Sequence, residues 1–136
     1  MAKIDPRLKL QLETAHLSVT FDDLGDAKGL VDLGQGRTQL FFVMSTTDAF
    51  PHFEVRKVWS PVAAVGSLPI QQLALPLLRK NTECEFGYIA IAGDLIIFQA
   101  NIAADCDPDV LRAVILGVCV AADTIEQQLT KGGDAF

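Results

Sequence analysis

Two β-rich runs joined by only two residues limit most strongly what this chain can fold into. The runs Glu85–Ala92 and Leu95–Ala103 flank Gly93-Asp94, and glycine in the first loop position suits a tight two-residue hairpin turn. That turn sets the register of an antiparallel pair, because Ala92 must then lie opposite Leu95. Three further pairs follow from this register: Ile91 with Ile96, Ile89 with Phe98, and Tyr88 with Gln99.

The two faces of this hairpin are both rich in apolar side chains. One face is expected to belong to the core and carries Ile89, Ile91, Ile96, Phe98 and Ile102. The other face carries Phe86, Tyr88, Leu95 and Ile97 beside Gln99 and Asn101. A sheet face left to water should be more polar than this. We therefore predict that Phe86, Tyr88, Leu95 and Ile97 form a partner-binding surface.

A long helix is predicted to end the fold. Asp107-Pro108-Asp109 has the residues of a helix start, and an apolar stripe follows at helical spacing: Leu111, Ile115, Val118, Ala122, Ile125 and Leu129. Gly117 costs about 1 kcal/mol in a helix interior, which the close approach of another backbone would offset. Leu116 and Val120 face away from the stripe, so they are either scattered surface apolars or, as our candidate, a dimer contact.

The remaining segments complete a pattern of helices and strands. A short helix is expected from Pro6 to Ala15 with Asp5 as its cap. Strands are expected at Leu17–Phe21, Leu30–Leu33, Gln39–Met44 and Phe53–Val65. Ile70–Asn81 is expected to be helical, with Pro76 either kinking the helix or starting its regular part.

The predicted fold class is α+β, with two layers: an antiparallel sheet flanked by helices. The elements follow the order α-β-β-β-α-β-β-α. A length of 136 residues fits a single domain over residues 1–136, and residues 131–136, after the last periodic position, are expected to form a frayed tail.

Charge and cysteine content narrow the classes of partner and the compartment. The net charge is −6, with 11 basic and 17 acidic residues, so nucleic acid and membrane surfaces are not expected as partners. The N-terminus lacks the apolar stretch of a signal peptide, and the longest apolar run, Ala113–Ala122, is shorter than the roughly 20 residues that span a bilayer. Cys84, Cys106 and Cys119 are expected to be reduced, and the protein to be cytoplasmic. Arg56-Lys57 and Arg79-Lys80 are expected to be solvated charges.

No pattern of catalytic or metal-ligating residues emerges from the sequence. Gly34 and Gly36 lack the third glycine of a dinucleotide-binding motif. Asp105, Asp107 and Asp109 imitate the start of a calcium loop, but Val110 stands where that loop needs glycine. We therefore expect no catalytic residue, no metal, no cofactor and no enzymatic activity. Trp59 is either a core or edge aromatic or the rim of a binding face.

A set of segments in the second half of the chain resembles a known family. These segments are Leu77–Asn81, Phe86–Ile91, Gly93–Ala100, Asp107–Leu111, Ala122-Asp123 and Gln127–Leu129. Together they resemble the YbjN family of bacterial sensory transduction regulators, whose fold is similar to that of type III secretion chaperones. The resemblance is best over residues 77–129, and it implies an α+β homodimer that holds an extended or partly unfolded peptide of another protein.

Two functions remain as hypotheses from the sequence. The first is a non-catalytic, chaperone-like or regulatory domain in bacterial sensory or stress regulation, which binds a protein or an extended peptide client and forms a homodimer. The alternative is a small-molecule sensor with an apolar pocket between sheet and helices, in which Tyr88, Gln99 and Asn101 supply the polar groups.

Overall fold

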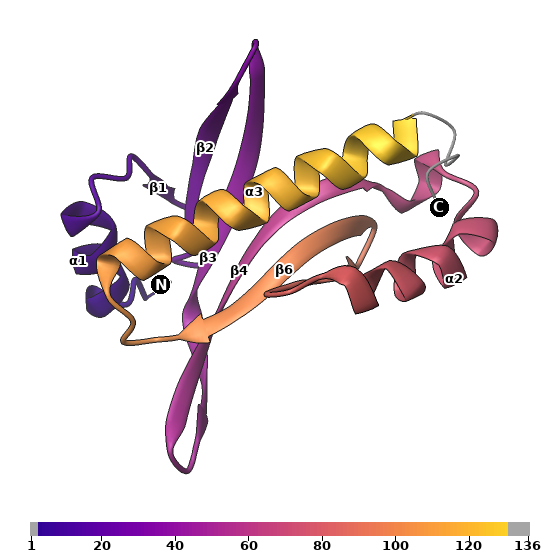
Figure 1. The fold of residues 1–136 in the computed structure, drawn as a ribbon. Coiled ribbons are helices and arrows are strands. Elements are labelled where there is room, and N and C mark those ends of the chain that lie inside the picture. Colours follow the sequence, from indigo (N-terminus) through magenta and orange to yellow (C-terminus); the bar gives the residue numbers. More distant parts are fainter. Residues whose placement is uncertain (1–2, 131–136) are drawn as a thin grey trace.

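A computed structural model of the chain describes residues 3–130, which form three α-helices and a six-stranded antiparallel sheet (Figure 1). In chain order the elements are α1 (Pro6–Thr14), β1 (Thr20–Phe21), β2 (Ala27–Gly34), β3 (Arg37–Phe50), β4 (Phe53–Ala64), α2 (Ile70–Lys80), β5 (Tyr88–Ala92), β6 (Leu95–Ala103) and α3 (Pro108–Thr130), with short 3-10 turns at Val65–Ser67 and Asn81–Glu83. The strand order in the sheet is β1-β2-β3-β4-β6-β5. The α+β class and the order of elements are confirmed. The strand expected at Leu17–Phe21 is present as the two-residue edge strand β1, so four strands rather than three precede α2. The expected tail at 131–136 lies outside the described residues.

The β5–β6 hairpin has the predicted register. Tyr88 pairs with Gln99 and Ala92 pairs with Leu95, with Gly93 at a φ of 58° in the turn. One expectation for the core face is wrong: Ile91 is 54% exposed. The side chain lies on the edge strand, one residue from its end, beyond the part of the face that the other elements bury.

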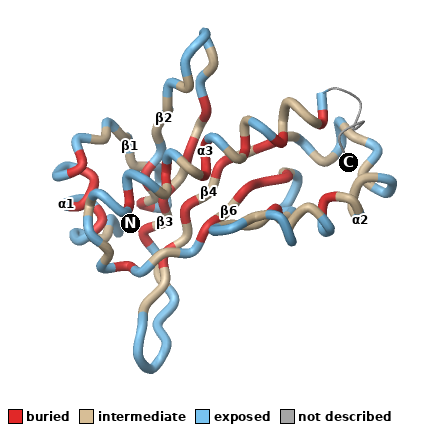
Figure 2. The backbone as a smooth tube through the Cα atoms, viewed as in Figure 1, coloured by how far each residue is buried: buried red, intermediate tan, exposed pale blue. Residues whose placement is uncertain are grey.

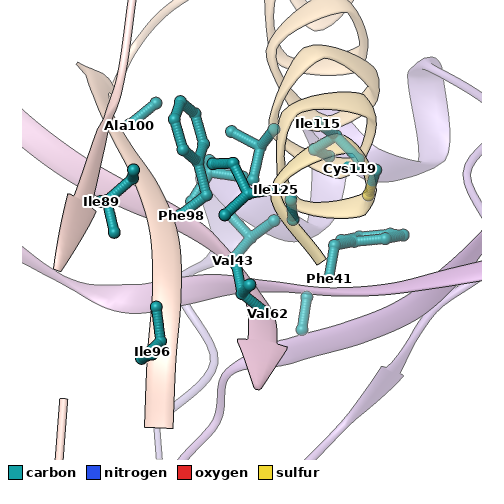
Figure 3. Close-up of a cluster of buried hydrophobic side chains, with 14 of the residues drawn as sticks. Phe41, Val43, Val62, Ile89, Ile96, Phe98, Ala100, Ile115, Cys119 and Ile125 are labelled. Carbon is teal, nitrogen blue, oxygen red and sulfur yellow. The ribbon is translucent and has the colours of Figure 1, made fainter. Parts of the chain in front are cut away.

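Helix α3 lies along one side of the sheet and closes the core (Figures 1 and 2). Its buried side chains are the six of the predicted stripe together with Cys119. They meet the inward-facing side chains of β3, β4, β5 and β6, among them Phe41, Val43, Val58, Val62, Ile89, Ile96, Phe98 and Ala100 (Figure 3). This side of the sheet, which we call the inner face, is therefore the core of the protein.

Helix α2 runs beside the edge strand β5 and protects that edge. The helix begins at Ile70 and continues through Pro76, so Pro76 does not start it. At its end, the Asn81 side chain accepts a hydrogen bond from the Ile89 amide at 2.6 Å and donates one to the Ile89 carbonyl at 3.1 Å. Asn81 thus takes the place of a neighbouring strand at this point, which blunts an otherwise unpaired edge.

Arg56 is buried, and the expectation that it is a solvated charge is wrong. The side chain has no exposed surface. It donates to the carbonyls of Met44 and Ser45 at 2.7 and 3.0 Å and to the Asp5 carboxylate at 2.7 Å. The two carbonyls lie in a β-bulge between Val43 and Thr47, where the ladder leaves backbone groups without a partner. Arg56 supplies the missing donors, which explains why a charge is retained in the core.

Candidate protein-binding face

The side of the sheet turned away from α3 is also apolar at its centre. Because directly opposite residues of an antiparallel pair share a face, the register assigns these side chains to one surface. Its central residues are Lys28, Leu30, Leu40, Phe42, Lys57, Trp59, Pro61, Tyr88, Ala90, Leu95, Ile97, Gln99 and Asn101, and Asp32 and Asp48 lie on it nearer the hairpin turns. We call this surface the outer face. The solvent-facing side of an antiparallel sheet is usually polar. On the outer face, by contrast, the polar residues surround an apolar strip.

Three of the four residues predicted to bind a partner share the outer face. Tyr88 and Leu95 are half-buried there. Ile97 lies between Pro61 and Ala90 in the register but is only 3% exposed. Ile97 therefore packs within the surface rather than presenting itself to a partner.

Phe86 does not lie with the other three residues. Its ring packs edge-on against Phe98 of the inner face, with the centroids 5.8 Å apart, and it covers Gly117 of α3. A Cβ atom on Gly117 would come within 2.8 Å of the Phe86 ring. The glycine thus makes room for an aromatic side chain, whereas the sequence analysis had predicted the close approach of another backbone. Phe86 precedes β5, so the alternation of the strand does not extend to it.

The polar side of the outer face is a small hydrogen-bonded group. The Gln99 amide donates to the Tyr88 hydroxyl, and this hydroxyl donates to the Asn101 side chain at 3.4 Å. All three residues belong to neighbouring positions of β5 and β6. The group holds the Tyr88 ring in place at one border of the apolar strip.

The centre of the outer face is a pair of stacked aromatic rings. The sequence analysis had named only Trp59 of this pair, with the rim of a binding face as one of two alternatives. Phe42 of β3 pairs with Trp59 of β4, and their rings lie parallel with centroids 4.2 Å apart. Lys28 pairs with Phe42 from the other side, and Lys57 precedes Trp59 by two residues on the same face. The centre of the apolar strip is therefore an aromatic pair, with Lys28 beside Phe42 on β2 and Lys57 two residues along β4 from Trp59.

A hollow of about 450 Å³ opens beside this strip at β2, where the short edge strand β1 pairs only with Ala27 and Lys28. It is lined by Ser18, Val19, Thr20, Lys28, Gly29, Leu30 and Leu40. Leu30 is 66% exposed, so an apolar wall of the hollow faces solvent, with the Lys28 side chain at its border. A hollow of this kind accepts an apolar side chain of a partner.

The two residues predicted as a dimer contact lie on the solvent side of α3. Leu116 and Val120 are 50% and 48% exposed, and Val110 on the same helix is 47% exposed. Between Asp109 and Asp123 the helix carries only one charged residue, Arg112, which donates to the Ala15 carbonyl at 2.9 Å. This is a second apolar surface, on the opposite side of the molecule from the outer face.

The remaining side chains with potential reactivity include three cysteines. The three cysteines are free thiols. Burial raises the pKa of Cys119 to about 12 and also raises the pKa values of Cys84 and Cys106, so these thiols carry a proton at neutral pH. In residues 3–130 no group of three or more His, Cys, Asp or Glu side chains is placed to hold a metal ion.

No helix in the described part of the chain combines the length and the hydrophobicity that crossing a bilayer requires.

Comparisons with known proteins do not assign the chain to a family. No protein-family model matches its sequence, and no curated protein matches it significantly. The resemblance to the YbjN family therefore stays a prediction that rests on the residue pattern. What the geometry defines is the class of domain: a two-layer α+β domain with an apolar outer sheet face.

Proposed function

We propose that this chain is a non-catalytic protein-binding domain, which acts as a chaperone-like or regulatory adaptor in the bacterial cytoplasm. The observation that carries the proposal is the outer face, where stacked Phe42 and Trp59, exposed Leu30 and a hollow of about 450 Å³ lie on one surface. Monomeric soluble proteins rarely expose contiguous apolar patches without an interaction to serve. The resemblance to regulators with a secretion-chaperone fold agrees with such a role.

A homodimer is part of this proposal. The exposed apolar side chains of α3, Val110, Leu116 and Val120, are separate from the outer face. A two-fold pairing of α3 with its copy would bury these residues twice and leave the outer face available for a client. Light scattering of the purified protein should then give about twice the mass of one 14.7 kDa chain, and Leu116→Glu with Val120→Glu should give a folded monomer.

The sensor hypothesis is supported by a different feature. A hollow of about 430 Å³ lies between the sheet and the helices. It is lined by residues of β4, the segment before α2, α2 and α3, among them Leu68, Leu73 and Leu129. The polar groups expected for such a pocket are not there, however: Tyr88, Gln99 and Asn101 lie on the outer face. This hollow offers Glu126 and Ser67 instead, so we keep the sensor as the second candidate.

The experiment that tests protein binding is capture from lysate with paired variants. Leu30→Asp with Tyr88→Ala alters two residues of the outer face, and we avoid Ile97 because it is buried. The control is Leu24→Asp, a residue that is 74% exposed in the loop between β1 and β2 and not on this face. We expect the double variant to keep its circular dichroism spectrum and to lose the captured protein, and the control to retain it. Equal capture by all three proteins would overturn the proposal.

A further inference from the structure

The charged residues at the centre of the outer face are opposite in sign to the net charge of the protein. Lys28 lies opposite Phe42, and Lys57 precedes Trp59 by two residues on β4, while the chain carries a net charge of −6. Neither lysine takes part in an ion pair within residues 3–130. The centre of this face is therefore a locally positive, apolar strip on an acidic protein.

Two acidic residues, Asp32 and Asp48, also lie on the outer face toward its hairpin turns, and within residues 3–130 neither forms an ion pair with Lys28 or Lys57. Asp32 pairs with Thr38, next to the turn that joins β2 and β3, and its carboxylate accepts from the Gly34 amide at 2.8 Å. Asp48 pairs with Val55, which lies two residues from Lys57 on β4 and near the tip of the β3–β4 hairpin. Partner carboxylates could thus approach the two lysines, and each such contact would be weakened by salt.

A second copy of the chain does not fit this surface. In a two-fold dimer through the outer face, each central lysine would meet the same cationic strip on the other copy. Like charges placed opposite each other at an interface oppose association. The charge distribution therefore favours a different partner, one that brings negative charge.

The orientation of the two rings argues against single-stranded nucleic acid as the partner that binds the outer face. Phe42 and Trp59 are stacked on each other with an interplanar angle of 13°, so each ring already has one face covered by the other. Proteins that bind single-stranded nucleic acid offer open ring faces on which bases stack. The acidic charge of the chain adds to this argument.

The hydrogen bonding of the central strands indicates which conformation a partner bound to the outer face has. Strands β3, β4 and β6 each have a hydrogen-bonded neighbour on both sides, so the face offers side chains and no free backbone groups. A bound strand would leave its own amides and carbonyls unpaired over this face, which is costly. A helix satisfies its backbone internally, and helix-on-sheet packing is the usual way to cover an apolar sheet face.

We propose that the outer face binds an amphipathic helix of a partner protein, with an apolar stripe flanked by Asp or Glu side chains. One apolar side chain of this helix enters the hollow beside Leu30, the stripe covers Phe42 and Trp59, and the flanking carboxylates pair with Lys28 and Lys57. This inference rests on the proposed protein-binding function and specifies the chemistry of its client.

The test uses two synthetic helical peptides of about 18 residues, or five turns, with the same leucine stripe. One carries glutamate along the flanks of the stripe and the other carries lysine. Binding is followed through the fluorescence of Trp59, which is the only tryptophan of the chain and lies in the proposed site. We expect the glutamate peptide to bind at least tenfold more tightly than the lysine peptide, with an affinity that falls as salt is added.

A charge-reversal pair of variants separates this site from a general charge effect. Lys28→Glu with Lys57→Glu should invert the preference of the protein, so that the lysine peptide binds more tightly. Lys9→Glu with Arg79→Glu changes the net charge equally at exposed positions away from this face, and should keep the original preference. Equal affinity for both peptides, or an equal loss in both double variants, would overturn the inference.

The outcomes also separate this inference from the proposed function. If the outer-face variant Leu30→Asp with Tyr88→Ala loses its captured protein while the glutamate peptide fails to bind, protein binding stands and the acidic helix is wrong. If a single-stranded oligonucleotide quenches Trp59 and competes with the peptide, the class of partner is wrong.

Discussion

Arg56 is buried although arginine side chains usually lie at the surface. We predict that replacing Arg56 with methionine destabilises the protein more than replacing any one of the exposed charged residues. The change removes three hydrogen bonds of 2.7–3.0 Å, two of them to the Met44 and Ser45 carbonyls of the bulge and one to Asp5. Methionine fills much of the space but donates nothing, so these buried acceptors lose their donor. Breaking a buried charge pair by removing one partner costs about 3–5 kcal/mol, which is a large part of a total stability of about 5–15 kcal/mol.

Urea unfolding followed by Trp59 fluorescence measures this loss. With a urea m-value of about 2 kcal/mol/M, a loss of 3–5 kcal/mol lowers the midpoint by about 2 M. The m-value itself should not change, because the bulge is a local feature.

Arg7→Met is the matched control, since Arg7 pairs with the same Asp5 carboxylate at 2.9 Å. Its side chain is 47% exposed, and exposed pairs contribute about 1 kcal/mol or less. If both variants lost the same stability, burial of the guanidinium would not be the source of its effect, and the reasoning would be refuted.

Three further predictions concern the edge of the sheet, the helix and acid. Asn81→Ala should cost about 1–3 kcal/mol and speed hydrogen exchange at the Ile89 amide, whereas unchanged exchange would argue against its role at the edge. Gly117→Ala should gain up to about 1 kcal/mol of helix propensity only in a Phe86→Ala background, where no ring is displaced; a double-mutant cycle in urea that finds no coupling would contradict this. Burial opposes ionisation of Asp5, but hydrogen bonds from Arg7 and Arg56 outweigh it and hold the pKa of that carboxyl well below its ordinary 3.8. The stability that Asp5 contributes is therefore complete above about pH 5 and is lost as the pH falls through that lowered pKa, so Asp5→Asn should flatten the acid side of a Tm-against-pH curve.

The elements that could be predicted from the sequence are those with a local rule. The Gly93-Asp94 turn allows one register, and the structure has that register. The apolar stripe of α3 has helical spacing from Leu111 to Leu129, and the same residues are buried. In both cases the pattern and its cause lie within a single element or a single turn.

The features that were missed depend on contacts between distant segments. Arg56 resembles a solvated charge in the sequence, because its partners Met44 and Asp5 lie 12 and 51 positions away. Phe86 follows the parity of β5 but precedes that strand, and its place is set by the space above Gly117. No local rule reports either contact.

The centre of the outer face, with Phe42 stacked on Trp59, was not predicted for a related reason, and that reason links this face to the stability of the core. Lys28, Phe42 and Trp59 adjoin one another only when three strands are in register. On β3 the three residues 44–46 stand where β4 has only Lys57, and Arg56 holds the carbonyls of this bulge. Because side chains alternate between faces, a one-residue slip there would turn Trp59 and Lys57 into the core. Arg56, which touches no part of the outer face, thus keeps its aromatic and cationic side chains on one surface.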